Sequence, residues 1–326
     1  MTNQQSIEEY FQLAQNSLEE IGKVMVGQKD LLEKLMIGLL ADGHILVEGV
    51  PGLAKTTAIK TMSDVIDSDF SRIQFTPDLL PADLLGTQIY RPNTGEFVVK
   101  KGPIFSNFIL ADEINRAPAK VQSALLESMQ EKQVSIGEET FHLPPTFLVM
   151  ATQNPVEQEG TYLLPEAQVD RFMLKVNVDY NQFDEEIQMA KRVTSGDFKK
   201  VTVNKILNPE MVMKMRSLIN DIFIDEKVYH YIAQIIFSTR KPSDYNLSSL
   251  SNLIEFGASP RATINFIKAS RARAFLNGRS FVTPEDVKSL SYDILRHRIA
   301  LTYEADAQEI GVEEVISKII STVRVP

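Results

Sequence analysis

The segment Gly49-Val50-Pro51-Gly52-Leu53-Ala54-Lys55-Thr56 decides how the rest of the chain is interpreted. It is a glycine-rich loop between an apolar run at 45–47 and a stretch with helical apolar spacing at 57–66. The first N–H groups of a helix have no partner within the helix, so such a loop can surround a phosphate group. Lys55 adds a cation for the terminal phosphates, and Thr56 adds a hydroxyl for Mg²⁺. The sequence therefore predicts a nucleoside triphosphate site, to which we add the adjacent Thr57.

One position departs from the usual G-x-x-x-x-G-K-[ST] pattern, because Ala54 stands where glycine precedes the lysine. Alanine is the smallest substitute, but its Cβ restricts the backbone, so we expect an ordinary conformation at Ala54. On these residues alone, a ligand-free turn from strand to helix with a similar composition remains an alternative.

Composition narrows the class of protein. The chain has 326 residues, of which 24% are charged and 44% hydrophobic, as in globular proteins of one large or two ordinary domains. Its net charge of −9 argues against broad nucleic-acid binding, although a local basic loop remains possible. It contains no cysteine, which excludes disulfides and thiolate chemistry. Its four histidines are scattered without ligand spacing, and we expect no metal site on them.

The N-terminus is polar and acidic, and it lacks the basic start and apolar core of a signal peptide. No apolar run approaches the roughly 18 residues of a membrane span. We therefore expect a cytoplasmic protein.

The pattern of apolar residues divides the chain into an α/β domain at 1–182 and a helical domain at 183–326. Residues 6–41 are predicted to form two helices, and from 44 to about 178 short apolar runs alternate with helical stretches. This alternation is typical of a mostly parallel sheet covered by helices. The predicted strands are 45–47, 73–75, 108–110, 147–151 and 173–178.

A second candidate motif is the apolar strand at 108–111 that ends in Asp112 and Glu113. Two carboxylates at a strand end suit nucleotide hydrolysis, with Asp112 holding Mg²⁺ through its water shell and Glu113 polarising the attacking water. Taken alone, the pair fits a solvated strand end equally well. Its position after a phosphate loop favours the catalytic interpretation.

Three further polar residues follow in chain order. Asn154 comes directly after the strand at 147–151 and could orient the attacking water, although an ordinary Asn-Pro turn explains it as well. Arg171 precedes the last strand, and Arg261 opens a helix of the second domain. Either arginine could stabilise charge on a transferred phosphoryl group, and either alone could be a surface ion-pair residue.

Together these motifs resemble the AAA+ ATPases, and among them the MoxR family. The resemblance rests on GVPGLAKT at 49–56, LADEINRA at 110–117, ATQNP at 151–155, LPEAQVDRF at 164–172 and GASPRA at 257–262. It covers roughly residues 20–300 and implies an α/β P-loop NTPase core with a parallel sheet and a smaller all-α lid. Alanine before the lysine is normal for this family.

The resemblance also implies a role for each candidate residue, with ATP and Mg²⁺ as the ligands. The implied roles are the adenine-side contact for Val26 and Gly27, Walker A for 49–56, Walker B for Asp112 and Glu113, sensor 1 for Asn154, the arginine finger for Arg171 and sensor 2 for Arg261. An arginine finger acts on the nucleotide of a neighbouring subunit, so the resemblance implies a homo-oligomeric ring, which we expect to be a hexamer.

Two hairpins are predicted, one around Asn93-Thr94-Gly95-Glu96 and one across 130–142 around Gly137. The first resembles the helix-2 insert that MoxR proteins share with magnesium chelatase and MCM-type ATPases, an insert that faces the partner side of the ring. The resemblance to the MoxR family implies a chaperone that inserts metals or matures protein complexes, usually with a von Willebrand factor A (VWA) domain partner.

Three function classes result. The favoured one is a Mg²⁺-dependent ATPase that remodels a partner protein complex. The alternative is a DNA-acting motor of the MCM kind, which the net acidity disfavours but which Arg91, Lys100 and Lys101 near the first hairpin keep open. A nucleotide-gated scaffold with little turnover is disfavoured, because Glu113 and Arg171 are both present.

Overall fold

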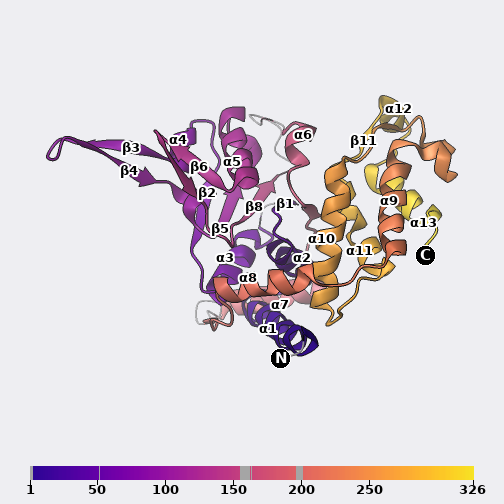
Figure 1. Ribbon diagram of the computed structural model, residues 1–326, viewed down its shortest axis with the longest axis horizontal. Helices are drawn as coiled ribbons and strands as arrows, with labels where there is room; N and C mark the ends of the chain where they lie inside the picture. Colours follow the sequence, from indigo (N-terminus) through magenta and orange to yellow (C-terminus); the bar gives the residue numbers. More distant parts are fainter. Residues whose placement is uncertain (1–2, 51, 155–161, 163, 196–200) are drawn as a thin grey trace.

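The computed structural model describes residues 3–50, 52–154, 162, 164–195 and 201–326. An α/β core and a helical bundle lie side by side, and a long hairpin projects from the far side of the core (Figure 1). The predicted fold class is confirmed. Within the described residues, no helix is long and apolar enough to cross a membrane.

The core is built on a five-stranded sheet in which every pairing is parallel. In spatial order the strands are β2 (Phe70–Gln74), β5 (Phe108–Asp112), β8 (Leu148–Gln153), β1 (Ile45–Glu48) and β9 (Leu174–Asn177). All five predicted strands are present, with ends shifted by a few residues. Since parallel strands end at the same edge, the residues that follow β1, β5 and β8 lie close together there.

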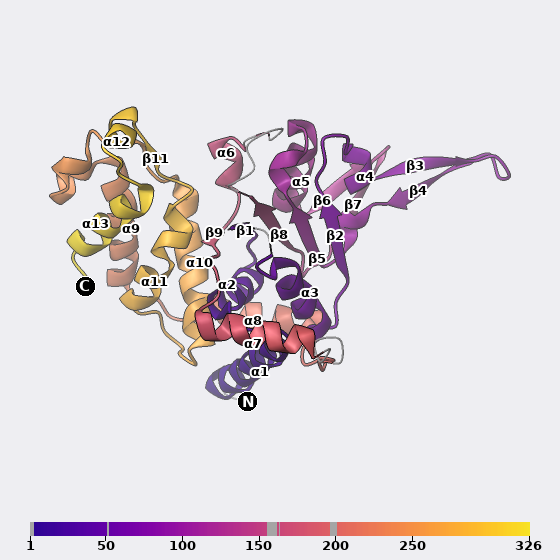
Figure 2. The same cartoon turned by 180° about the vertical axis from the view of Figure 1, so that it is seen from behind.

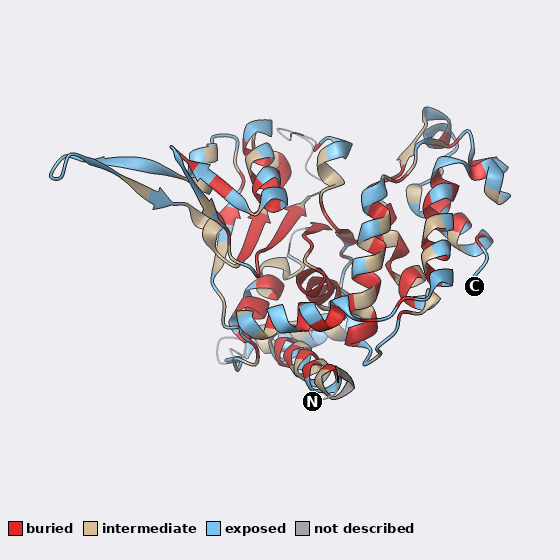
Figure 3. Cartoon of the chain, viewed as in Figure 1, coloured by how far each residue is buried: buried red, intermediate tan, exposed pale blue. Residues whose placement is uncertain are grey.

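Helices cover both faces of this sheet, because successive side chains of a strand point to opposite faces. Ile45 and Val47 face the helices α1 (Asn3–Val24), α2 (Lys29–Leu40) and α3 (Lys55–Val65). Leu46 faces the other side, against α4 (Pro81–Leu85) and α5 (Ala119–Glu131). The central strands are buried on both faces, as Figure 3 shows.

Both predicted hairpins are confirmed. One pairs β3 (Gly86–Arg91) with β4 (Glu96–Lys101), and the other pairs β6 (Gln133–Ile136) with β7 (Glu139–His142). The first extends far beyond the core (Figure 2) and exposes three large apolar side chains. These are Ile89, Tyr90 and Phe97.

The C-terminal part is mostly helical, as predicted. It follows α6 (Glu166–Val169), the short helix before β9, and consists of α7 (Phe183–Thr194), α8 (Pro209–Asn220), α9 (Glu226–Arg240), α10 (Pro260–Leu276), α11 (Pro284–Leu295), α12 (Tyr303–Ala307), α13 (Val312–Thr322) and the short strands β10 (Ile254–Phe256) and β11 (Ala300–Leu301). The predicted helix start at Asn208 is capped, since the Asn208 side chain accepts a hydrogen bond from the Met211 N–H. Because α8 packs on α1 and α2 as well as on α10, the domain division at 182/183 stays a prediction.

Candidate functional site

A cavity of about 370 Å³ lies at the carboxyl edge of the sheet and brings the predicted phosphate loop and the predicted acidic pair together. Its lining residues are Gly49, Gly52, Leu53, Ala54, Lys55, Thr56, Arg72, Gln74, Asp112, Glu113, Thr152, Gln153 and Asn154. The predicted Val50 lies in the same loop, whereas Pro51 falls outside the described residues. Residues more than 100 positions apart therefore converge here, because β1, β5 and β8 are neighbours in one parallel sheet.

The backbone of the loop corrects one expectation. Ala54 adopts the left-handed conformation, with φ 55° and ψ 22°, immediately before α3 begins at Lys55. The expectation of an ordinary backbone was wrong, since the turn requires positive φ here whatever the side chain. A left-handed alanine costs roughly 1–2 kcal/mol, a strain typical of functional loops.

Lys55 lies at the start of α3 with its ammonium group inside the loop. Its Nζ donates a hydrogen bond of 2.6 Å to the carbonyl oxygen of Gly49. Burial lowers the pKa of Lys55, and the carboxylates of Asp112 and Glu113 oppose this shift. A negatively charged ligand in this cavity would replace lost hydration of the ammonium group.

The acidic pair is held by Thr152 of β8. The Thr152 hydroxyl donates to Asp112 Oδ1 at 2.7 Å, and it accepts a hydrogen bond of 2.9 Å from the Glu113 N–H. Glu113 is itself left-handed, with φ 55°, at the turn after β5. Its Oε2 accepts hydrogen bonds from Gln74 at 2.9 Å and from Arg116 at 3.0 Å. The two carboxylates are therefore held in place before any ligand binds.

Sequence reasoning missed Arg72, Gln74 and Thr152. Arg72 Nη2 lies 2.6 Å from Asp112 Oδ2, so the predicted metal-holding carboxylate has a cationic neighbour on β2. Arg72 and Gln74 occupy alternate positions of β2, a signal that gains meaning only because β2 pairs with the acidic strand β5. Neither residue belongs to a pattern that would single it out without the strand order.

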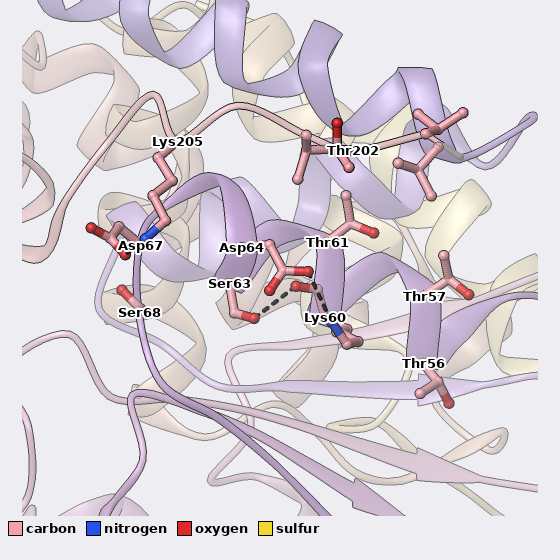
Figure 4. A pocket seen from close by; sticks show the side chains of 13 residues that line it. Thr56, Thr57, Lys60, Thr61, Ser63, Asp64, Asp67, Ser68, Thr202 and Lys205 are labelled. Carbon is pink, nitrogen blue, oxygen red and sulfur yellow. Dashed lines mark hydrogen bonds and ion pairs between the residues drawn. The ribbon is translucent and has the colours of Figure 1, made fainter. Parts of the chain in front are cut away.

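Thr57 lies in a different cavity from the other loop residues. This cavity, of about 590 Å³, runs along α3 from Thr56 to Ser68 and is closed by residues 201–205 (Figure 4). Lys205 forms an ion pair of 2.5 Å with Asp67 at its far end. Thr56, at the start of α3, lines both cavities.

Val26 and Gly27 line neither of these cavities. Gly27 has φ +72°, and a Cβ there would come within 2.6 Å of Glu185 Oε2. The carbonyl of Val26 accepts a hydrogen bond of 3.5 Å from Asn181. Both residues thus pack against the segment that follows β9. The carbonyl of Val178, in the same segment, lies close to Gly49.

The two predicted arginines lie apart from the phosphate-loop cavity. Neither Arg171 nor Arg261 lines it. Arg261 contacts Asp170 Oδ2 and Gln130 Oε1, both at 3.4 Å. Among the described residues, the half-buried Arg171 side chain has no hydrogen bond or ion pair, and its backbone sits in the turn after α6.

A buried arginine of the helical part holds the turn that carries Arg171. The Arg298 side chain is fully buried, and its Nε donates to Asp170 Oδ1 at 2.7 Å. Its terminal nitrogens donate to the carbonyl oxygens of Asp170 at 2.9 Å and Met173 at 3.2 Å. Burial lowers the pKa of Arg298 to about 10, and Asp170 opposes that shift. Sequence reasoning did not find Arg298, since nothing near residue 298 indicates a contact with residue 170.

The donor set of the cavity suits Mg²⁺. Thr56 offers a hydroxyl and Asp112 a carboxylate, which are hard oxygen ligands, and the magnesium ion usually keeps several waters beside one or two such groups. The described residues contain no cluster of three or more His, Cys, Asp or Glu that could hold a metal alone.

Comparison with protein families gives two matches. Residues 44–174 match the ATPase family associated with various cellular activities (AAA), and residues 249–319 match the AAA lid domain. The first match covers the loop and the strands β1, β2, β5 and β8, and the second covers α10, α11, α12 and most of α13.

Individual proteins and structures are similar over nearly the whole chain. Chaperone MoxR1 of Mycobacterium tuberculosis is 48% identical over 96% of this chain and 82% of its own length. Protein MoxR of Methylorubrum extorquens is 28% identical over 94% of this chain and 93% of its own. A crystal structure from Cytophaga hutchinsonii, provisionally described as an ATPase, is 51% identical, with a TM-score of 0.93 over 99% of this chain and 98% of that one.

Proposed function

Because the chain belongs to the MoxR family of AAA+ ATPases, we propose that it binds ATP with Mg²⁺ in the cavity beside Lys55 and hydrolyses it. One observation carries this proposal: a single cavity is lined by the phosphate loop, Lys55, Thr56, the acidic pair and Asn154. These are the parts that phosphoryl transfer to water requires.

Each residue has a proposed task in this site. The backbone N–H groups at the start of α3 and the Lys55 ammonium bind the phosphates. Thr56 and Asp112 hold Mg²⁺, which neutralises charge on the phosphate oxygens when it is bound. Glu113 accepts a proton from the attacking water, and Asn154 orients that water. We place the nucleoside half beyond Thr56, toward Thr57 and the Val26–Gly27 segment, since Thr56 and Thr57 line the neighbouring cavity.

The proposed site is completed by a neighbouring subunit. Arg171 and Arg261 both lie outside the chain's own phosphate cavity, beside Asp170. We propose that Arg171 stabilises charge on the nucleotide of the next subunit, which requires a ring, and that Arg261 acts as sensor 2. We propose a hexamer with one nucleotide site at each interface.

For the physiological task, we propose that hydrolysis moves the helical lid against the core and thereby remodels a partner protein. The name of the relative MoxR1 as a chaperone supports this class. The exposed Ile89, Tyr90 and Phe97 of the β3–β4 hairpin are a candidate contact for the partner. We retain a VWA-domain partner and metal insertion as the specific form of this proposal. The relatives reported above are not described as DNA-acting, and we do not propose the DNA motor.

The nucleotide site is tested by calorimetric titration of ATP into the protein with Mg²⁺ present. Lys55→Ala removes a charge-assisted interaction worth about 1.5–3 kcal/mol, so ATP affinity should fall by at least about tenfold. Lys318→Ala, on the exposed face of α13, serves as the matched control and should bind like the parent. Equal affinity of the Lys55→Ala variant and the parent would overturn the site.

A further inference from the structure

A third cavity lies where the α/β core meets the helical part. It has a volume of about 440 Å³ and opens between the end of α2, the turn from α5 to β6, and the helices α8 and α10. These three helices pack against one another (Figure 1). None of the residues that line this cavity also lines the phosphate-loop cavity. It is therefore a separate site.

The lining of this cavity is strongly basic. Lys132, Arg216, Lys268 and Arg271 contribute four cations, and Asp42 contributes the single carboxylate, which leaves an excess of three positive charges. Asp42 is already neutralised, since Lys132 contacts its Oδ2 and Arg216 Nη1 lies 2.8 Å from its Oδ1. The whole chain carries a net charge of −9, so this concentration of cations runs against the overall composition.

Two buried nitrogen atoms at the cavity lack a hydrogen-bond partner among the described residues. Arg216 is only 8% exposed, and its Nε and Nη1 donate to the carbonyl oxygens of Leu39 and Pro145 at 2.9 and 2.8 Å, but its Nη2 has no acceptor. Arg271 Nε is buried and unpaired as well. Leaving a buried charged donor unpaired is costly, and both arginines line the cavity, so an acceptor that enters it and that these side chains turn to meet would remove that cost.

We propose that this cavity binds the phosphate group of a small molecule. A phosphate brings about two negative charges and several acceptor oxygens, whereas a carboxylate brings one charge, and the excess of three cations favours the former. Arg271 and Lys268 reach it from α10, Arg216 from α8 and Lys132 from the core. A bound phosphate would join the core to the lid. The inference does not depend on ATP hydrolysis.

The test is a calorimetric titration of inorganic phosphate at constant ionic strength, with chloride as the replaced anion. It uses a Lys55→Ala background, so that the phosphate loop does not contribute. Adding Lys268→Gln and Arg271→Gln should weaken phosphate binding by at least about tenfold. Adding Lys318→Gln, an exposed site on α13, should leave it unchanged. A circular dichroism spectrum and melting curve of each variant establish that it is folded.

Two results would overturn the proposal. One is phosphate affinity that is equal with and without the two α10 substitutions, or no detectable binding at millimolar phosphate. The other is that the two α10 substitutions change the self-association of the protein, measured by light scattering, while added phosphate does not affect it. That second result would mean that a carboxylate of another protein chain occupies the cavity.

Discussion

The phosphate-loop cavity and the Asp170 region differ in how complete they are. In the first, a threonine, a glutamine and two arginines hold the carboxylates of Asp112 and Glu113 at hydrogen-bond distance. In the second, buried Arg298 fixes the backbone of the turn, but the Arg171 side chain that the turn carries contacts no described residue through a hydrogen bond or ion pair. The acidic side chains of the first region are thus paired, whereas the Arg171 side chain of the second has no hydrogen-bond or ion-pair partner in the described part of the chain.

This difference supports the proposal that Arg171 acts across a subunit interface. An arginine that acts across a subunit interface needs a fixed backbone and a guanidinium group that remains available. Residues of its own subunit set its position, and the other subunit supplies the negative charge. Since Arg298 belongs to the helical part, movement of that part would also move the turn that carries Arg171. The nucleotide bound to one subunit could thus change where that subunit's Arg171 lies relative to the next subunit.

The largest expected effect comes from a substitution in the phosphate-loop cavity. Glu113→Gln keeps the shape of the side chain but cannot accept a proton from water, so turnover should fall by roughly 10²–10⁴-fold while ATP still binds. A coupled assay for phosphate release and a calorimetric titration separate the two quantities. Glu127→Gln, on the exposed face of α5, is the control and should keep parental turnover. If Glu113→Gln hydrolyses ATP at the parental rate, another residue is the base.

A second test concerns two buried histidines, His44 at the amino end of β1 and His297 beside the turn that carries Arg171. His44 Nδ1 accepts the Val149 N–H at 3.1 Å and its Nε2 contacts the Met129 carbonyl, while His297 Nε2 contacts the Phe172 carbonyl. Burial lowers the pKa of His44 from 6.5 to about 4, and it lowers that of His297 in the same direction. Each ring is neutral in the folded protein and must gain a proton on unfolding below pH 6.5.

Stability should therefore fall as the pH drops from 6.5 toward 4, because the unfolded state binds more protons there. For His44 the loss is about 3 kcal/mol, at 1.36 kcal/mol per pKa unit. Urea unfolding at pH 7 and pH 5 should show about 2 kcal/mol of this loss, since the full loss is reached only below pH 4. His44→Gln and His297→Gln should each reduce the pH dependence, and an unaltered dependence in both variants would show that neither histidine causes it.

The smallest expected effect concerns the strain in the loop. Ala54→Gly removes the Cβ from a left-handed residue and should raise the free energy of unfolding by up to about 1 kcal/mol. Ala58→Gly, in the helical interior of α3, should lower it by about 1 kcal/mol or more. Thermal unfolding of both variants is the measurement. A destabilised Ala54→Gly variant would contradict the assigned strain.

The sequence predicted the parts of the fold and site that depend on local patterns. Short apolar runs indicated the five strands, and Gly95 and Gly137 indicated the hairpins. Chain order placed Lys55, Asp112 and Asn154 at strand ends, which a parallel sheet brings to one edge.

What sequence reasoning missed depends on contacts between distant segments. Arg72 becomes a neighbour of Asp112 only because β2 pairs with β5, and Arg298 reaches Asp170 only through the packing of α11 against β9. An ordinary backbone was expected at Ala54, but this residue is left-handed, because the geometry of the turn outweighs the conformational preference of alanine.

The central claim, that Arg171 of one subunit acts on the nucleotide of the next, is tested most directly by mixing two inactive variants. Glu113→Gln and Arg171→Ala should each hydrolyse ATP slowly alone. In mixed rings, an intact Glu113 can face an intact Arg171 of its neighbour at about a quarter of the interfaces after random exchange. We therefore expect mixing to restore a substantial fraction of wild-type turnover. No rescue after verified subunit exchange, or wild-type turnover by Arg171→Ala at concentrations where the wild type assembles, would contradict the claim.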